Sequence, residues 1–412
     1  MRLRKSWPGE VVHRAKSTEQ SGKLSEFALD SGFSYVGELS GSRHLVTTFL
    51  NNIGEMIVNE AEIKRNPLDD YVWMEDENYS FSHEKTTRNA DSVVHHVKMI
   101  SQKWQNETLL QKPDQAFWQH RLDIIIPVNL ADTNTFLLHV TSQSLPLDFD
   151  SDHSDTYKTT KLFAENLGVV AAVLYQVPNQ PLDMVPIPGV KYQDIVYNGG
   201  RSEDGILARC WREFINNYIE KDLEDHTVLV QMPMAKAAVR ALETVTEFVY
   251  DKTGNYMTKA GVTGASKRGW TTWLTAAADY ERVDFMAPVY FDELNMVENI
   301  HHHFRSLGGY TYTFFDYYFA GITKYLDHPA VNASRLVLDV LEFKDRYAKH
   351  QVNYMITAGN DEFFLIDNPN YFYDELDEKT LMRIIPNQGR VSITESVLLI
   401  TRSFLTFLVV KF

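Results

Sequence analysis

The sequence predicts an α/β fold with a doubly wound, mainly parallel sheet. Apolar runs of strand length alternate with segments of helical spacing along most of the chain. The clearest unit is a strand from Tyr256 to Thr263, a tight turn, and a helix from Trp270 to Ala278. Because strand–helix–strand units join parallel strands through right-handed crossovers, this alternation is typical of a doubly wound sheet.

Before this unit, the pattern is readable from about residue 120. Leu122 to Pro127 and Thr135 to Thr141 are short apolar runs on either side of a polar turn, and we interpret them as a hairpin-like pair of strands. Lys158 to Leu167 has helical spacing. It leads into Val169 to Leu174, whose continuous apolar character is typical of a strand buried on both faces.

The segments on either side of the central unit follow the same alternation. Asp204 to Glu220 and Ala235 to Tyr250 are predicted helices, because their apolar residues recur on one face. Between them, Thr227 to Val230 is either a strand end or part of an excursion. Further along the chain, Asp284 to Tyr290 is a predicted buried strand.

The last part of the chain completes the predicted sheet. Gln351 to Thr357 and Leu381 to Ile385 are the final strands, and Ser392 to Val410 is a terminal helix. We expect a helical cap or excursion over about residues 292–350.

In terms of domains, we expect residues 1–60 to form an N-terminal segment of uncertain structure. The α/β domain is expected over residues 61–412.

Composition limits the classes of partner. Of 412 residues, 44% are hydrophobic, which is enough for a large core, and the net charge of −15 opposes binding to nucleic acids and anionic membranes. No apolar run is long enough to span a membrane. Glu298 and His302 have the spacing of metal ligands on a helix, but no third ligand follows, so we expect no metal and no cofactor.

Signals of export and of disulfide bonding are sparse. Met1 to Gly22 is polar and has no apolar core, so the sequence as written predicts no signal peptide. Three glycosylation sequons, at Asn78, Asn106 and Asn332, are a weak indication of secretion. Cys210 is the only cysteine, which excludes an internal disulfide.

The turn Gly264-Ala-Ser-Lys-Arg-Gly269 has the character of a serine-hydrolase nucleophile turn. On a sharp strand-to-helix turn, the hydroxyl of Ser266 would stand above the sheet, beside a helix N-terminus that favours negative charge. Small residues at Gly264 and Ala265 let the turn close, and Gly269 lets the helix pack on its neighbours. The alternative is an ordinary turn whose serine caps the helix.

The positions of the histidines conflict with this motif. In hydrolases of this kind, the triad follows the chain order serine, acid, histidine. The acid is expected at Asp361, in Gly359-Asn-Asp-Glu362, yet all 14 histidines lie at or before His350. The sequence therefore predicts the fold while it puts the usual chemistry of that fold in doubt.

Six segments together resemble the PhoPQ-activated pathogenicity-related proteins, a family that includes secreted autocrine proliferation repressors of social amoebae. The segments are Asn66-Pro-Leu-Asp-Asp-Tyr-Val72, Phe117-Trp-Gln-His120, Asn198-Gly-Gly-Arg-Ser-Glu-Asp204, Met232-Pro-Met-Ala-Lys-Ala-Ala-Val-Arg-Ala241, Gly264-Ala-Ser-Lys-Arg-Gly-Trp270 and Gly359-Asn-Asp-Glu-Phe-Phe364. The resemblance runs from about residue 60 to the C-terminus. It implies an α/β-hydrolase fold, often in an exported protein, with Ser266 as nucleophile and Asp361 as acid.

Two departures from the family bear on activity. After the last strand, Arg390 occupies the position at or near which relatives carry a histidine, and arginine cannot act as a general base because its pKa stays above about 12. The turn Thr141-Ser-Gln-Ser144 stands where a glycine-rich segment usually completes the oxyanion hole. Loss of one oxyanion donor typically lowers the rate about 100- to 1,000-fold.

A substitute base would have to come from an earlier part of the chain. His301, His302 and His303 are the candidates, because they belong to a predicted excursion from the strand that ends near Tyr290. The alternative is that they are surface or packing residues of a cap. Lys267 is not a natural proton acceptor for the adjacent serine, and with Arg268 it is expected to meet carboxylates or an anionic ligand.

An aromatic run near residues 310–319 could line a pocket, although packing is the more common role of such runs. Its members are Tyr310, Tyr312, Phe314, Phe315, Tyr317, Tyr318 and Phe319.

Two hypotheses of function remain. The first is a catalytically degenerate hydrolase-fold protein that acts by binding a protein receptor, a peptide or a small molecule, as an extracellular signal like the repressors it resembles. The second is an active serine esterase or peptidase with an unrecognised base. The missing late histidine favours the first, and the presence of Ser266 and Asp361 keeps the second open.

Overall fold

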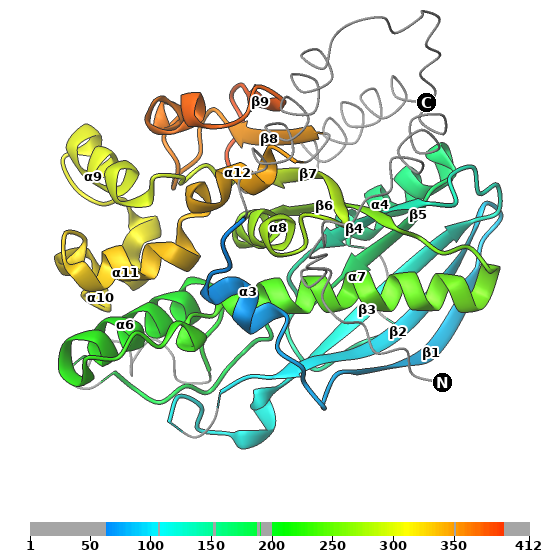
Figure 1. Ribbon diagram of the computed structural model, residues 1–412, viewed down its shortest axis with the longest axis horizontal. Coiled ribbons are helices and arrows are strands. Elements are labelled where there is room, and N and C mark those ends of the chain that lie inside the picture. Colours follow the sequence, from blue (N-terminus) through cyan, green and yellow to red (C-terminus); the bar gives the residue numbers. More distant parts are fainter. Residues whose placement is uncertain are drawn as a thin grey trace, which may run out of the picture. The chain divides into compact units, whose positions relative to one another are not determined.

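The computed structural model describes residues 63–105, 108–150, 154–187, 190, 200–349 and 352–390, all of which belong to one compact unit over residues 63–412 (Figure 1). The predicted N-terminal segment, residues 1–60, and the terminal helix predicted over Ser392 to Val410 lie outside the described residues. The division into domains stays a prediction.

One mixed sheet runs through the described residues, with strand order β1-β2-β3-β5-β4-β6-β7-β8-β9. The strands are β1 (Ser80–Arg88), β2 (Ser92–Lys103), β3 (Phe117–Pro127), β4 (Thr135–Val140), β5 (Val170–Leu174), β6 (Lys259–Ala265), β7 (Val283–Val289), β8 (Val352–Ala358) and β9 (Thr380–Ile385). Strands β1, β2, β3 and β5 pair antiparallel, and the pairs from β5 through β9 are all parallel.

Helices cover both faces of this sheet (Figure 1). They are α3 (Pro67–Val72), α4 (Asp155–Leu167), α6 (Asp204–Lys221), α7 (Gln231–Thr253), α8 (Lys267–Ala278), α9 (Met296–Leu307), α10 (Phe315–Phe319), α11 (Pro329–Leu338) and α12 (Lys344–Tyr347). None of these described helices has the length and apolar character needed to cross a bilayer.

The two faces can be followed from the alternation of side chains along the central strands. In β4, Leu138 belongs to the large core with α7 and α8, whereas Leu137 packs with Tyr157 and Phe163 of α4. Successive side chains of a strand point to opposite faces, so α4 covers one face and α7 and α8 cover the other. Strand β5 is buried at every position, as predicted from its unbroken apolar run.

The predicted hairpin-like pair of strands is wrong. Strand β3 pairs with β2 and β5, while β4 lies between β5 and β6, so the two strands are not neighbours. After β4 the chain forms α4 and returns as β5 parallel to β4, which is a strand–helix–strand crossover. A polar turn between two apolar runs does not determine which strand each run pairs with. In addition, Thr227 to Val230 overlaps a short 3-10 helix, His226–Val228, and is not a strand end.

Between β7 and β8 the chain leaves the sheet and forms α9, α10, α11 and α12. Helices α10 and α11 pack against α6, and α6, α9, α10 and α11 gather on one side of the sheet, at the left of Figure 1. A mainly parallel sheet covered on both faces, with a serine turn between β6 and α8, is an α/β-hydrolase fold. The predicted fold class is therefore confirmed.

Candidate functional site

Ser266 lies at the junction of β6 and α8, with a backbone φ of 61° and ψ of −124°. A positive φ is strained for a residue that has a Cβ atom, and such strain is typical of functional turns. Its backbone N–H donates to the carbonyl of Val289 at 2.8 Å, which ties the turn to the end of β7. Ser266 is thus at a nucleophile elbow, at the C-terminal end of a central strand.

The glycines around this elbow are required by close packing, as the sequence predicted. A Cβ atom on Gly264 would lie 2.7 Å from the carbonyl oxygen of Arg268. On Gly269 it would lie 2.7 Å from the carbonyl oxygen of Val289. Neither position has room for a side chain, so the glycines let α8 start directly against its own strand and against β7.

Asp361 and Arg390 meet Ser266 at this edge of the sheet. Asp361 follows β8, and its Oδ1 accepts the backbone N–H groups of Phe363 and Phe364 at 2.8 and 3.1 Å. Nη1 of Arg390 donates to the same oxygen at 3.2 Å, and Nη2 donates to Oγ of Ser266 at 2.5 Å. The guanidinium therefore bridges the serine and the carboxylate, which is where a triad histidine would stand.

The environment of Arg390 holds the guanidinium in this place. The guanidinium carbon, Cζ of Arg390, lies 4.5 Å from the ring centroid of Phe363 and 4.6 Å from that of Phe364, within cation–π distance. The backbone N–H of Arg390 donates to Oε2 of Glu362 at 3.4 Å. A guanidinium only donates hydrogen bonds and stays charged, so it occupies a lone pair of the serine oxygen and cannot accept its proton.

Both basic residues after Ser266 are paired with carboxylates. Arg268 donates to both carboxylate oxygens of Glu203 at 2.9 and 2.5 Å, and Lys267 lies 2.6 Å from Asp204 and 3.4 Å from Glu203. Burial alone would raise the pKa of Glu203, but the charge and hydrogen bonds of Arg268 outweigh it and lower the pKa to about 2. The expectation that these two side chains meet carboxylates is confirmed.

Two further acids, Asp292 and Glu293, lie beside Asp361 and Arg390, and neither forms an ion pair within the described residues. Burial, followed by the charge of Asp361, raises the pKa of Asp292 to about 7, and its Oδ1 has no hydrogen-bond partner among the described residues. Desolvation, followed by the charge of Asp292, raises the pKa of Glu293 to about 8. Acids with such raised pKa values are typical of functional sites.

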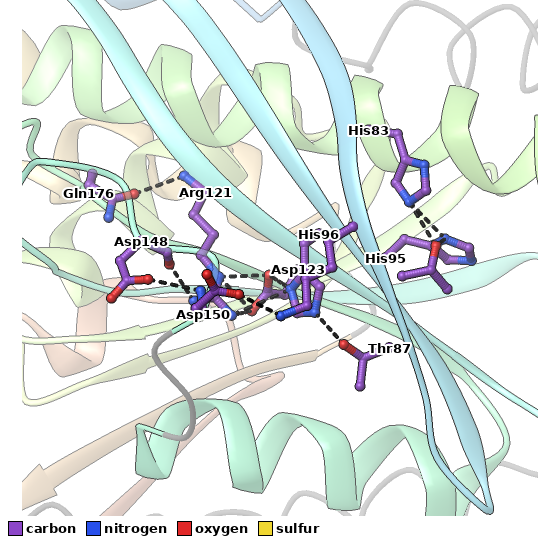
Figure 2. A network of polar contacts seen from close by, with 11 residues as sticks. His83, Thr87, His95, His96, Arg121, Asp123, Asp148, Asp150 and Gln176 are labelled. Carbon is purple, nitrogen blue, oxygen red and sulfur yellow. Dashed lines mark hydrogen bonds and ion pairs between the residues drawn. The ribbon is translucent and has the colours of Figure 1, made fainter.

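The loop after β4 is anchored by a buried polar network (Figure 2). Arg121 of β3 pairs with Asp123 at 2.8 Å and donates to the carbonyl of Asp148 at 2.7 Å, and its backbone N–H donates to Gln176 at 2.8 Å. Gln176 in turn donates to Gln143 at 3.2 Å. The network therefore fixes the turn at residues 141–144, where the oxyanion hole of this fold is normally completed.

Two cavities adjoin Arg390. One lies beside Ser266, Thr141 and Ser142, and holds about 990 Å³ of space that no atom fills, part of it open to solvent. The other holds about 620 Å³ by the same measure. Its wall is mostly apolar, and its aromatic members are Trp211, Trp270, Phe291, Phe314, Tyr317, Phe363 and Phe364. Two members of the aromatic run, Phe314 and Tyr317, thus line a cavity, whereas Tyr312 and Tyr318 are exposed.

The three histidines of α9 form contacts away from Ser266. Nε2 of His301 lies 2.8 Å from Asp327, and Nε2 of His302 lies 2.9 Å from Asp367. His303 donates from Nδ1 to the carbonyl of Phe363 and accepts the backbone N–H of Thr311 at Nε2, both at 3.2 Å. The structure brings Ser266, Asp361 and Arg390 together, whereas the hydrogen bonds of these histidines go to other residues. A role for one of them as the base stays a prediction, and it would require that histidine to give up its present contacts and approach Ser266.

Three features of the site were not predicted from the sequence: Glu203 as the partner of Lys267 and Arg268, the acids at residues 292 and 293, which form no ion pair within the described residues, and the cavity beside them. One signal was available, because Glu203 and Arg268 belong to two of the motifs that carry the family resemblance. Two charged motifs of opposite sign, far apart in the chain, could have been predicted to meet.

Solved structures with a similar backbone are esterases and related hydrolases of low sequence identity. An acetyl xylan esterase from Paenibacillus sp. R4 has 12% identity and a TM-score of 0.48, covering 90% of this chain and 97% of its own. An S-formylglutathione hydrolase from Agrobacterium tumefaciens has 12% identity and a TM-score of 0.46, covering 79% of this chain and 98% of its own. We draw no functional argument from these two similarities.

Similarity in sequence is much higher to a protein of Dictyostelium discoideum, autocrine proliferation repressor protein A. The two are 32% identical over 340 residues, which is 79% of this chain and 61% of that protein. This chain therefore spans about three fifths of the length of that relative. The family model that describes the PhoPQ-activated pathogenicity-related proteins matches residues 68–411 of this chain. On these grounds, the chain belongs to the family of PhoPQ-activated pathogenicity-related proteins.

Proposed function

We propose that this protein is a catalytically incomplete α/β-hydrolase that acts by binding a ligand or a receptor, and that it does so outside the cell. The observation that carries the proposal is the position of Arg390, which donates to Ser266 and pairs with Asp361. Attack by a serine requires a group that takes its proton, and a guanidinium does not.

The role of Asp361 changes with its partner. In a working triad, the carboxylate orients a histidine and stabilises the imidazolium that forms during the reaction. Here the carboxylate is paired with a permanent cation, so the charge that the reaction would generate is already present in the resting protein. We infer that the three residues form a static, neutralised cluster, and that two of them, Ser266 and Arg390, shape one wall of a ligand cavity.

An extracellular role is carried over from the relative whose name describes an autocrine repressor of proliferation. The alternative function is an active esterase or peptidase with another base. The strained elbow at Ser266 favours that alternative, because a positive φ is usually kept where the serine reacts.

A turnover assay separates the two functions. We expect the unmodified protein and Ser266→Ala to hydrolyse p-nitrophenyl acetate at the same background rate, because neither has an activated serine. An intact hydrolase of this fold, assayed in parallel, shows that the conditions detect turnover. A rate that falls by about 100-fold or more in Ser266→Ala would establish an active serine and end the proposal.

A further inference from the structure

In the wall of the cavity next to Arg390, one acid, Glu293, forms no ion pair with any described residue. This acid is the basis of a more specific inference about the ligand, which rests on the proposed binding function. The cavity lies between the end of β7, the start of α8, and the segments around α6, α9 and α10. The charged side chains in its wall are Asp204, Lys267, Glu293 and Arg390.

The charges in this wall do not balance. Lys267 pairs with Asp204 at 2.6 Å and with Glu203 at 3.4 Å, and Arg390 pairs with Asp361 at 3.2 Å. Within the part of the chain that the structure describes, the carboxyl of Glu293 has no hydrogen bond and no ion pair. Asp292, its neighbour, also has no cation. When ionised, Glu293 is therefore a negative charge without a partner that faces a cavity.

The rest of the wall is largely apolar, with aliphatic side chains and seven aromatic rings. Trp270 and Phe291 stack with their centroids 4.9 Å apart, and Phe291 meets Phe364 edge-on at 5.6 Å. The indole N–H of Trp270 donates to the carbonyl of Leu338, and that of Trp211 donates to Ser334. Because both indole donors are used elsewhere, the tryptophans offer the cavity only their apolar ring surface. Aromatic faces attract organic cations.

We propose that this cavity binds an organic ammonium group, with Glu293 as its counter-ion and the aromatic rings around its alkyl substituents. An ammonium group would supply the missing positive charge, and its carbon atoms would cover apolar surface. A carboxylate or phosphate ligand fits less well, since Lys267 and Arg390 already have acidic partners and an ionised Glu293 would repel it.

Binding of such a ligand is linked to pH. The charged and titratable groups that act on Glu293 are Asp292, Arg390, Asp361 and Asp339, of which only Arg390 favours its ionised form. The pKa of about 8 means that Glu293 carries a proton at neutral pH in the empty cavity. An ammonium ligand favours the ionised acid, so its binding should release a proton at pH 7 and tighten as the pH rises through 8.

The experiment uses the full chain and a matched pair of probes, choline and its neutral carbon isostere 3,3-dimethylbutan-1-ol, titrated by calorimetry. We expect choline to bind about tenfold more tightly than the isostere at pH 9, and this preference to shrink at pH 6. Calorimetry in two buffers with different ionisation enthalpies would detect the released proton at pH 7. Equal binding of the two probes, or no binding of either, would overturn the inference.

Variants assign the effect to Glu293. Glu293→Gln should lower the affinity for choline about tenfold and remove its pH dependence, while it keeps the shape of the side chain. Glu378→Gln, which alters an exposed acid after α12, should change neither. Thermal melting checks that both variants fold, and a folded Glu293→Gln that binds choline normally would contradict the inference. Tighter binding of acetate or phosphate than of choline would also contradict it.

The two proposals can fail separately. If choline does not bind while Ser266→Ala leaves hydrolysis unchanged, the ammonium site is wrong and the binding function stands. If hydrolysis depends on Ser266, the binding function is wrong, whatever the choline titration gives.

Discussion

Two arginine–aspartate clusters of similar chemistry lie in different parts of this molecule. In the interior, Arg121 pairs with Asp123, which also accepts from Nδ1 of His96 at 2.6 Å (Figure 2). At the edge of the sheet, Arg390 pairs with Asp361 and donates to Ser266. In both clusters one arginine holds one carboxylate beside a third polar side chain.

Their surroundings differ. The side chains of Asp123 and Asp361 are both fully buried, so the difference lies in what adjoins them. The partners of Asp123 are also bonded elsewhere, since His96 contacts Thr87 at 3.0 Å and Arg121 reaches Asp148. Arg390 instead adjoins two cavities. Beside it, Asp292 and Glu293 have raised pKa values and no cation. The charged groups of the inner cluster are paired with one another and buried. The outer cluster has more carboxyl groups than cations, and it adjoins two cavities.

This difference separates a structural network from a functional one. A buried network in which the charges are paired fixes the backbone around it, here the loop after β4. Unpaired acids beside a cavity lower stability, because their charged forms are poorly solvated, and proteins keep such groups chiefly where a ligand or a reaction uses them. This contrast supports the proposal that ligand binding takes place at the outer cluster.

The largest expected effect concerns the inner cluster. Asp123→Asn should lower the free energy of unfolding by about 3–5 kcal/mol, because it removes a buried carboxylate that pairs with Arg121 and accepts from His96. Asp361→Asn should cost clearly less, about 1–2 kcal/mol, since Asp292 or Glu293 can ionise and replace the lost charge. Urea unfolding at pH 7 measures both.

A half-exposed carboxylate provides the control for this comparison. Asp367, whose side chain is 51% exposed, contacts His302, and Asp367→Asn should change stability by less than about 1 kcal/mol. If Asp361→Asn costs as much as Asp123→Asn, the two clusters are energetically alike, and the distinction between them fails.

A smaller effect is expected at the elbow. Ser266→Gly should be more stable than Ser266→Ala by about 1 kcal/mol, because glycine adopts the positive φ of 61° without strain. The neighbouring Ala265 belongs to strand β6, and Ala265→Gly should destabilise instead. The same urea titrations give these values. Equal stability of the glycine and alanine variants at 266 would indicate that the elbow is not strained in solution.

Most of the sheet could be predicted from the sequence because its central strands are continuous apolar runs. Strands β5 to β8 and helices α4, α6, α7 and α8 fall close to the predicted ranges. Strands β1 and β2 were missed. Most of β1 is exposed and polar, so no apolar pattern marks it. The pairing of β3 was also missed, because a local pattern carries no information about which distant strand lies beside it.

At the candidate site, the sequence supplied the residues but not their contacts. The motif around Ser266, the motif around Asp361 and the missing late histidine were all readable. That Arg390 would point at Ser266, rather than into solvent, depends on Phe363 and Phe364, which hold its guanidinium. The cavity with Glu293 could not be predicted, since its walls come from segments between residues 204 and 390.

The central claim is that Arg390 replaces the base and leaves Ser266 inactive, and labelling with a fluorophosphonate probe tests it most directly. We expect the unmodified protein to react slowly and Arg390→His to react faster at Ser266, because an imidazole there can accept the proton while Asp361 orients it. General base catalysis typically raises the rate about 100- to 10,000-fold. We expect an increase near the lower end of this range, because Thr141-Ser-Gln-Ser144 replaces the glycine-rich segment that usually completes the oxyanion hole. Ser266→Ala in the Arg390→His background should abolish the labelling. Rapid labelling of the unmodified protein that disappears in Ser266→Ala would contradict the account.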